Sequence, residues 1–483
     1  MHVHRTGIVL KPNNSRVVIR PFDIPSESRI ERIIARIAAL SDAEVERQLE
    51  AVMRDFRARH QRTREFFLYR FEQVRKHLLT DQPVGESRRL LIGSYFTSEY
   101  ALESAALFNP SMVWHPDQSG LPDGSRRFVV SLRATGEGHI SSITFRSGVI
   151  DAANLIRIDE PTRFVRAPEV VPNAIYEKAL FYRKLTELGI NGPLTEGVMA
   201  ALGDAFTLDE LERTLRTVLK NFRTRQREFE PLAHTMLVLA KANYEVRFDP
   251  ELNVSERIIF PSSPTETNGI EDARFVRFTH PDGRTSYYAT YTAYDGRVTL
   301  PQMLETDDFL HFKVGTLNGP EVKNKGFALF PRMVNGQYAM LSRQDNENLY
   351  LMYSDMPYFW YSKQLVARPT YPWEFVQLGN CGSPVETEAG WLVLTHGVGP
   401  MRRYAMGAFL LDLNDPARLI GRLETPLLEP DANEREGYVP NVVYSCGAVV
   451  HGETLVIPYA MSDYASTFAT VPLADVLGAM TRV

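Results

Sequence analysis

Cysteine is scarce in this chain, which has only Cys381 and Cys446 among its 483 residues. Two cysteines are too few for a disulfide framework or for a zinc site built from cysteine ligands. We therefore expect both to be reduced residues that pack in the core.

The chain also lacks long apolar runs and an excess of positive charge. Its first fifteen residues, MHVHRTGIVLKPNNS, have no signal-peptide core, and no segment approaches the length of a membrane span. The formal net charge of −5 disfavours a general nucleic-acid binder. No His, Asp and Glu cluster has convincing metal-ligand spacing. We expect a soluble, cytoplasmic protein without metal, organic cofactor, nucleic acid or membrane partner.

Helical patterns occur in two separate blocks of the sequence. Ser28 to Glu31 forms a capping-box pattern that predicts a helix to Leu40, and Ser41 to Glu44 repeats the pattern before a second helix that continues towards Leu79. A further helical block between Pro172 and Lys241 contains the capping-box pattern Thr207 to Glu210. Two helices are therefore expected before the main body, and a helical insertion within it.

Most of the remaining chain alternates with a period of two, which predicts strands. The clearest are residues 128–133, 140–145, 287–294, 338–342, 349–354, 391–395 and 454–459. We predict these parts: 1–90 an N-terminal extension with helices, 91–165 the first strand-rich part, 166–242 the helical insertion, and 243–483 the rest. The pattern is typical of a β-sandwich, a barrel or a propeller. Polar turns recur at blade-like intervals near Arg133, Asp272, Lys325, His396 and Asp463, so five strand groups are one interpretation.

The polar residues at these turns each have an ordinary structural explanation. Asp272 and Arg274 could form a structural ion pair, Lys325 could be a solvated turn lysine, and His396 a buried histidine. Yet all of them lie next to an apolar strand, where a rigid scaffold can present a site. A propeller would bring them together on one face, and their cations would suit an anion such as phosphate.

At these residues the chain resembles glycoside hydrolase family 130, the inverting β-mannoside phosphorylases and related β-mannosidases. The resemblance runs, in chain order, through Phe108–Pro110, Ser131–Arg133, Gly269–Arg274, Asn324–Pro331, Leu341–Arg343, Gly390–Val398 and Tyr459–Asp463. It covers nearly all of the strand-rich chain. The resemblance implies a mainly β fold, a five-bladed β-propeller with its site at the central opening, here with added N-terminal helices and a helical insertion.

The resemblance also implies roles for single residues. Asp272 matches the catalytic acid, which protonates the leaving oxygen through a hydroxyl of the mannose ring. The positions that hold the mannosyl unit are matched by Asn109, Arg133 and Asp463, and we count Glu271 and Arg274, which flank the acid, with the substrate-binding residues. The positions around phosphate are matched by Lys325, Arg343, His396 and Tyr404.

Simple chemistry favours phosphorolysis over hydrolysis. An inverting hydrolase needs an acid and a carboxylate base that activates water, but phosphate is already a nucleophile and needs cations to hold it. The strand ends offer Lys325, Arg343 and His396 as such cations. We expect phosphorolysis of a manno-oligosaccharide or mannosyl-glucose substrate to α-mannose 1-phosphate. An inverting β-mannosidase, with Glu271, Asp345 or Asp463 as base, and a non-catalytic glycan-binding propeller remain open.

Two features depart from the family pattern. Ala273 follows the acid where the family usually has proline, which loosens the loop without removing the acid. The helices of 1–90 and 166–242 match no well-known member. They either cover a propeller edge, or form a homo-oligomer interface or a wall over the acceptor sites.

Overall fold

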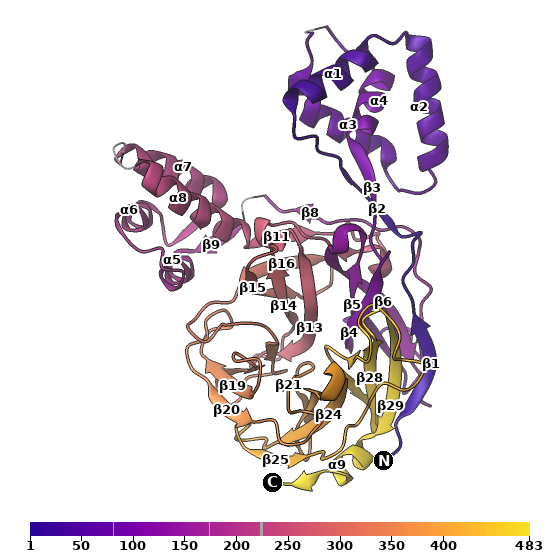
Figure 1. The fold of residues 1–483 in the computed structure, drawn as a ribbon, viewed down its shortest axis with the longest axis vertical. Coiled ribbons are helices and arrows are strands. Elements are labelled where there is room, and N and C mark those ends of the chain that lie inside the picture. The colour runs from indigo at the N-terminus through magenta and orange to yellow at the C-terminus, as the bar shows by residue number, and fades with distance from the viewer. Residues whose placement is uncertain (81, 173, 223–225) are drawn as a thin grey trace.

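The computed structural model describes residues 1–80, 82–172, 174–222 and 226–483. Strands account for 37% of the residues and helices for 25%. Most helical residues lie in two blocks outside the large sheets (Figure 1). The protein is therefore mainly β, as predicted.

The largest sheet joins two antiparallel strand groups. The first group contains β4 (Ala106–Trp114), β5 (Arg126–Thr135) and β6 (Ser141–Ile150), with β7 (Ile156–Ile158) and β12 (Ile258–Ile259) paired to β6. The second contains β13 (Gly269–Thr279), β14 (Thr285–Tyr294), β15 (Thr299–Thr306), β16 (His311–Thr316), β11 (Tyr244–Arg247) and β8 (Glu169–Val170). The groups meet where Gly269 pairs in parallel with Ser141.

The other long strands form three further sheets. One contains β17 (Ala328–Leu329), β18 (Tyr338–Ser342), β19 (Leu349–Ser354) and β20 (Gln364–Ala367). Another contains β21 (Gln377–Asn380), β22 (Val385–Thr387), β23 (Gly390–Val398), β24 (Tyr404–Leu411), β25 (Leu419–Arg422) and β30 (Thr481–Arg482). The last contains β1 (His4–Leu10), β26 (Val443–Tyr444), β27 (Val449–His451), β28 (Thr454–Met461) and β29 (Ala465–Pro472).

The sheets surround a common centre, and the two ends of the chain lie close together (Figure 1). The first strand, β1, pairs with β29 near the C-terminus, with His4 opposite Thr470. Strand β23 is buried along its whole length, as expected for a strand covered on both faces. The predicted strands are confirmed, because each lies in an observed strand to within one residue.

The N-terminal helical block contains α1 (Glu27–Ala38), α2 (Asp42–Phe56), α3 (Thr63–Val74) and α4 (Glu86–Tyr95). The prediction of two helices is therefore wrong. The chain turns at Arg62, whose φ is +55°, and α4 begins without a side-chain cap at Gly85. The capping box at Ser41 is confirmed, but the one at Ser28 is not, because α1 begins one residue earlier.

A helical block lies within the range predicted for the insertion, beside the edge strand β8 and its neighbour β11 (Figure 1). It contains β9 (Ile175–Glu177), α5 (Lys178–Glu187), α6 (Pro193–Ala201), β10 (Ala205–Thr207), α7 (Leu208–Lys220) and α8 (Gln226–Lys241). Outside this block, a short helix α9 (Leu473–Gly478) follows β29. The capping box at Thr207 is confirmed. Leu211, Leu215 and Val218 are buried on the predicted face of α7, so the block has a hydrophobic core of its own.

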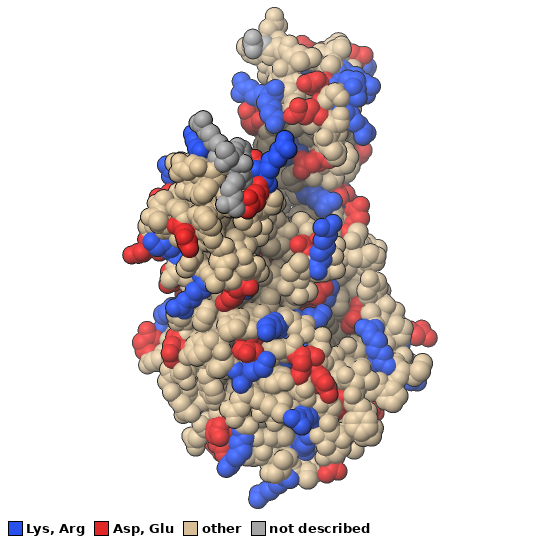
Figure 2. All heavy atoms as spheres, turned by 60° about the vertical axis from the view of Figure 1, so that its left-hand side comes forward, with Lys and Arg blue, Asp and Glu red and all other residues tan. Residues whose placement is uncertain are grey.

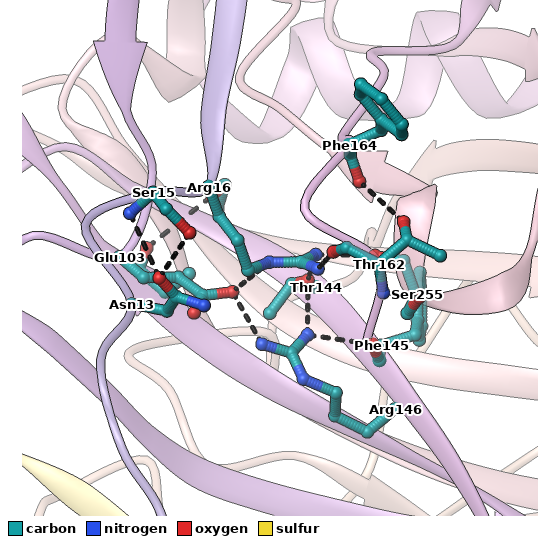
Figure 3. A network of polar contacts seen from close by, with 12 residues as sticks. Asn13, Ser15, Arg16, Glu103, Thr144, Phe145, Arg146, Thr162, Phe164 and Ser255 are labelled. Atoms are coloured by element: carbon teal, nitrogen blue, oxygen red, sulfur yellow. Dashed lines mark hydrogen bonds and ion pairs between the residues drawn. The ribbon is translucent and has the colours of Figure 1, made fainter. Parts of the chain in front are cut away.

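A buried charge network fixes the chain between β1 and β2 (Val17–Pro21) to the first strand group (Figure 3). Arg16 and Glu103 have fully buried side chains, and Arg16 Nε lies 2.9 Å from Glu103 Oε1. Arg146 on β6 donates to the same oxygen at 2.7 Å. Buried charges persist only when they are paired and hydrogen-bonded. The network therefore holds β2, its partner β3 (Thr97–Ala101) and the helices between them against β6.

Cys381 and Cys446 are buried and free, as predicted. No helix in the described ranges is long and apolar enough to cross a membrane. On the face drawn in Figure 2, basic and acidic side chains are interspersed.

Candidate active site

The strand that carries the predicted acid is bulged at the acid itself. The register of β13 with β14 shifts on either side of Asp272, which has a φ of +54°. Strand β4 has a matching bulge at Asn109, which has a φ of +49°. Asp and Asn enter this left-handed region more readily than other non-glycine residues, and a bulge redirects a side chain. The two bulges bring Asn109 Nδ2 to 2.7 Å from Asp272 Oδ1, as donor to acceptor.

Arg133 connects the two carboxylates of the acid loop. Its guanidinium lies 3.2 Å from Asp272 Oδ1 and 3.0 Å from Glu271 Oε1, and it lies over the ring of Phe108 at 5.0 Å. Lys325 Nζ lies 3.5 Å from the other oxygen of Glu271. The structure thus brings these predicted site residues from three strand groups into one cluster.

Arg274 braces the backbone of the acid. It is 2% exposed, and it donates to the backbone oxygens of Asp272 and Cys381 at 3.1 and 2.9 Å and to the Tyr444 hydroxyl at 2.7 Å. Its hydrogen bond to Asp272 goes to the backbone oxygen and not to the carboxylate. The sequence allowed a structural ion pair between the side chains of Asp272 and Arg274, and the structure does not have this pair.

The two aspartates of the cluster have pKa values shifted in opposite directions. Burial alone would raise the pKa of Asp272, but the charges of Arg133, Arg274 and Lys325 outweigh it and hold that pKa well below its usual range. Burial and the neighbouring Asp272 charge raise the pKa of Asp463 to about 6. Neighbouring carboxyls with separated pKa values are typical of sites that hold and move protons.

The predicted phosphate residues form the second part of the cluster. A Cβ built on Gly379 would lie 2.6 Å from His396 Cε1 and 2.9 Å from Arg343 Cδ, so this backbone runs tightly against both side chains. A Cβ on Gly326, next to Lys325, would lie 2.4 Å from Arg343 Nε. The structure therefore brings Lys325, Arg343 and His396 together.

His396 acts here as an uncharged side chain. Its ring is fully buried, stacks on Tyr404 at 6.0 Å and meets Tyr444 edge-on at 5.0 Å. Burial, with the charges of Arg343 and Arg274, lowers the pKa of His396 well below its usual range. Counting His396 among the cations is therefore wrong. It can offer a hydrogen bond, and the ring of Tyr404 lies beside it.

Some of the buried polar atoms that have no hydrogen-bond partner in the described part of the chain lie in this cluster, and others, such as Arg89 Nε and Arg422 Nε, lie elsewhere. Those in the cluster are Arg343 Nε, Asn109 Oδ1 and both ring nitrogens of His396. Such atoms are rare in folded proteins unless a ligand or water completes them. The cluster therefore has the unsatisfied donors and acceptors that a polar ligand needs.

Two of the bases considered for hydrolysis are already engaged. Asp345 is exposed and caps its own turn by accepting from Glu347 N and Asn348 N at 3.0 and 2.9 Å. Glu271 is shared between Arg133 and Lys325. The third candidate, Asp463, has a pKa that burial and the Asp272 charge raise to about 6. Among the described residues, no group of three or more His, Cys, Asp or Glu is arranged to hold a metal ion.

Sequence reasoning missed Tyr444, which ends β26 and meets both Arg274 and His396. It is a polar group at the end of an apolar strand, which is the pattern that identified the other candidates. The same rule, applied to shorter strands, would have found it.

The matching family model covers the C-terminal part of the chain. Residues 218–482 match the model of glycoside hydrolase family 130, described as beta-1,4-mannooligosaccharide phosphorylase. A 1,2-beta-oligomannan phosphorylase of Thermoanaerobacter sp. (strain X514) is 33% identical over 233 residues, or 47% of this chain and 75% of that relative. A beta-1,2-mannobiose phosphorylase of Listeria innocua serovar 6a is 33% identical over 227 residues, or 45% of this chain and 62% of that relative.

A solved structure was also found. The Listeria innocua beta-1,2-mannobiose phosphorylase, in complex with beta-1,2-mannobiose, is similar with a TM-score of 0.47 and 21% identity, over 78% of this chain and 92% of that one. The matched family range begins inside α7. Asn109 and Arg133, the N-terminal helices and most of the helical insertion therefore lie before it.

Proposed function

Because the chain belongs to glycoside hydrolase family 130, we propose that it is an inverting β-mannoside phosphorylase that forms α-mannose 1-phosphate from a β-mannoside and phosphate. The main support is the position of Lys325 beside Glu271 of the acid loop and of Arg343 beside Gly326, where an anion would meet the Lys325 ammonium group and the unpaired Nε of Arg343. Relatives named as phosphorylases of β-1,2-linked and β-1,4-linked mannosides point to the same reaction.

In this proposal Asp272 is the acid and phosphate the nucleophile. Phosphate attacks C1 of the mannosyl unit on the face opposite the leaving group, so a C1–O bond to phosphate forms as the glycosidic C1–O bond breaks. The leaving oxygen takes a proton from the Asp272 carboxyl through a mannosyl hydroxyl, and phosphate supplies the hydrogen that the carboxyl regains. Asn109, Arg133 and Asp463 hold the mannosyl unit, while Glu271 and Arg274 fix the surroundings of the acid.

The depressed pKa of Asp272 fits this scheme only if ligand binding raises it. The charges of Arg133, Arg274 and Lys325 hold the carboxyl ionised in the free protein. A bound phosphate dianion would offset the charge of Lys325, and the sugar would exclude water, and both changes favour the protonated acid. Acid and nucleophile sites are thus coupled through Lys325.

The test is a panel of β-1,2-mannobiose, β-1,4-mannobiose and mannosyl-glucose, each with and without phosphate. We expect sugar phosphate from at least one substrate and no turnover without phosphate. Free mannose in phosphate-free buffer would instead support an inverting β-mannosidase, with Asp463 as the base. Binding without any turnover would support the glycan-binding alternative.

We further propose that the strand groups are the five blades of a propeller. The blades would be β4–β6, β13–β16, β17–β20, β21–β25, and β26–β29 with β1. Parallel bridges between neighbouring groups, such as Gly269 to Ser141 and Thr279 to Arg332, support this assignment. The helices of 1–90 and 166–242 would then be additions to the propeller. An experimental structure with five blades about one axis would test it.

Phosphate is proposed as the only co-substrate, without a cofactor. A cytoplasmic location and a homo-oligomer formed through the added helices stay predictions from the sequence.

A further inference from the structure

One helix of the insertion holds the loop that carries Lys325. The loop runs from Leu317, after β16, to Phe327, before β17. Lys184 on α5 donates to the backbone oxygen of Leu317 at 3.2 Å, and Glu187 accepts from Gly319 N at 2.7 Å. The two side chains also pair with each other at 3.3 Å. Helix α5 therefore fixes the start of this loop from outside the strand groups.

These contacts are buried and leave the loop little freedom. The Lys184 side chain is only 7% exposed, although it carries a charge that is retained in the interior only when it is paired. Gly319 has a φ of +115°, and a Cβ there would lie 1.9 Å from the backbone oxygen of Trp360. The loop is thus pressed between α5 and the connection that follows β19, and Gly319 suits both its conformation and its space.

The middle of the loop is tied to the neighbours of Arg343. Gln344 Nε2 donates to the backbone oxygen of Glu321 at 3.2 Å, and Gln344 directly follows Arg343. The carboxylate of Glu321 pairs with Lys363 at 2.7 Å. If the start of the loop moved, the segment that carries Arg343 would therefore move as well as the segment that carries Lys325.

The far end of the loop enters the proposed phosphate site. Asn324 has a φ of +65°, Lys325 meets Glu271, and Gly326 lies against Arg343. Because the backbone at Gly326 packs tightly against Arg343, the position of the Lys325 ammonium group depends on the position of the loop. The affinity for a phosphate dianion depends steeply on the position of this ammonium group.

We propose that Lys184 and Glu187 are positioning residues that fix the Leu317–Phe327 loop so that Lys325 meets phosphate. The proposal rests on the proposed phosphorylase function. It gives the helical insertion, which lies mostly before the matched family range, a direct part in nucleophile binding instead of a purely covering role.

The test measures phosphorolysis by the variants Glu187→Ala and Glu187→Gln, each in the wild-type and the Lys325→Ala background. In the wild-type background, we expect Glu187→Ala to lower kcat/KM for phosphate about tenfold while changing KM for the mannoside less than about twofold. Glu187→Gln keeps an acceptor for Gly319 N and should give a smaller change in the same direction. In the Lys325→Ala background, Glu187→Ala should lower kcat/KM for phosphate much less, by under about threefold, because only the part that acts through Arg343 remains and coupled residues are not additive.

The control is Glu212→Ala, which removes a pair with Lys241 at 3.9 Å inside the same helical block. It should leave kcat/KM for phosphate unchanged. An unchanged kcat/KM for phosphate in both Glu187 variants, or an equal loss in the Lys325→Ala background, would overturn the positioning role. If Glu187→Ala does not fold, Glu187→Gln decides. Absence of phosphate-dependent turnover in the wild type would instead reject the phosphorylase function itself, and the inference with it.

Discussion

The guanidinium of Arg133 lies 3.2 Å from the carboxylate of Asp272, so a residue of β5 controls the charge of an acid on β13. Asn109 donates to the same oxygen at 2.7 Å. These two donors from one strand group stabilise the ionised acid, against the burial that opposes it. The free protein therefore holds Asp272 without its proton, and in the proposed mechanism phosphate binding near Lys325 prepares this carboxyl to donate.

Replacing the acid by its amide should abolish chemistry but not binding. In Asp272→Asn the amide oxygen can still accept from Asn109, but no proton is available, so kcat should fall about 10²- to 10⁴-fold. Steady-state phosphorolysis and calorimetric titration with mannobiose measure the two effects. Asp282→Asn, in the exposed turn between β13 and β14, is the matched control and should keep full activity. A kcat close to wild type for Asp272→Asn would reject this residue as the acid.

Removing the lysine of the proposed phosphate site should weaken phosphate binding selectively. A hydrogen bond to a charged group contributes about 1.5–3 kcal/mol, so Lys325→Ala should raise KM for phosphate about 10- to 100-fold. The exposed Lys323, two residues away, provides the control variant Lys323→Ala, which should not change it. Equal KM values for phosphate in the two variants would contradict this placement of phosphate.

Because its pKa is raised, Asp463 makes the free energy of unfolding depend on pH. The folded protein holds this proton more tightly than the unfolded chain does, because burial and Asp272 raise the pKa from 3.8 to about 6. The stabilising contribution is therefore present below about pH 4 and is lost as the pH rises through about 6. Asp272 has a lowered pKa, so its own contribution is lost only at more acidic pH.

Asparagine does not titrate, so Asp463→Asn should gain stability relative to wild type as the pH rises. Between about pH 4.5 and pH 7.5 the expected gain is about 2 kcal/mol, at 1.36 kcal/mol per pKa unit with some loss to solvent screening. Melting temperatures of both proteins at the two pH values test this. A difference that does not vary with pH would show that the carboxyl of Asp463 is not perturbed.

The buried network of Arg16, Glu103 and Arg146 should be important for stability. Glu103→Gln leaves two buried guanidinium groups without their counter-charge, so unfolding should become easier by about 3–5 kcal/mol. Chemical denaturation measures the change. The control Asp55→Asn breaks an exposed pair with Arg54 and should cost less than about 0.5 kcal/mol. A similar loss of unfolding free energy in the two variants would mean that the buried network stabilises the fold no more than an exposed ion pair does.

The sequence predicted the strands and most of the cluster because both depend on local patterns. Alternation of apolar residues locates a strand, and the polar residues at its end then become candidates, as at Asp272 and Asp463. The left-handed conformations of Asn109 and Asp272 were not predicted. They arise in bulges that depend on how β4 and β13 pair with their neighbours.

Other features depend on contacts between distant parts of the chain. Arg274 bonds to Cys381 and Tyr444, which are 107 and 170 residues away, so its bracing of the acid has no local signal. The neutral state of His396 follows from its burial beside two arginines. The break at Arg62 divides a charged stretch with continuous apolar spacing into α2 and α3, and α4 begins without a side-chain cap, so the sequence predicted too few helices.

The central claim is that phosphate takes the mannosyl unit with inversion, and nuclear magnetic resonance of the products tests it most directly. Wild-type protein, a β-mannobiose substrate and phosphate should give α-mannose 1-phosphate and mannose in equal amounts, with no reaction when phosphate is omitted. Release of two mannose molecules for each bond cleaved, or a β-configured sugar phosphate, would contradict the account.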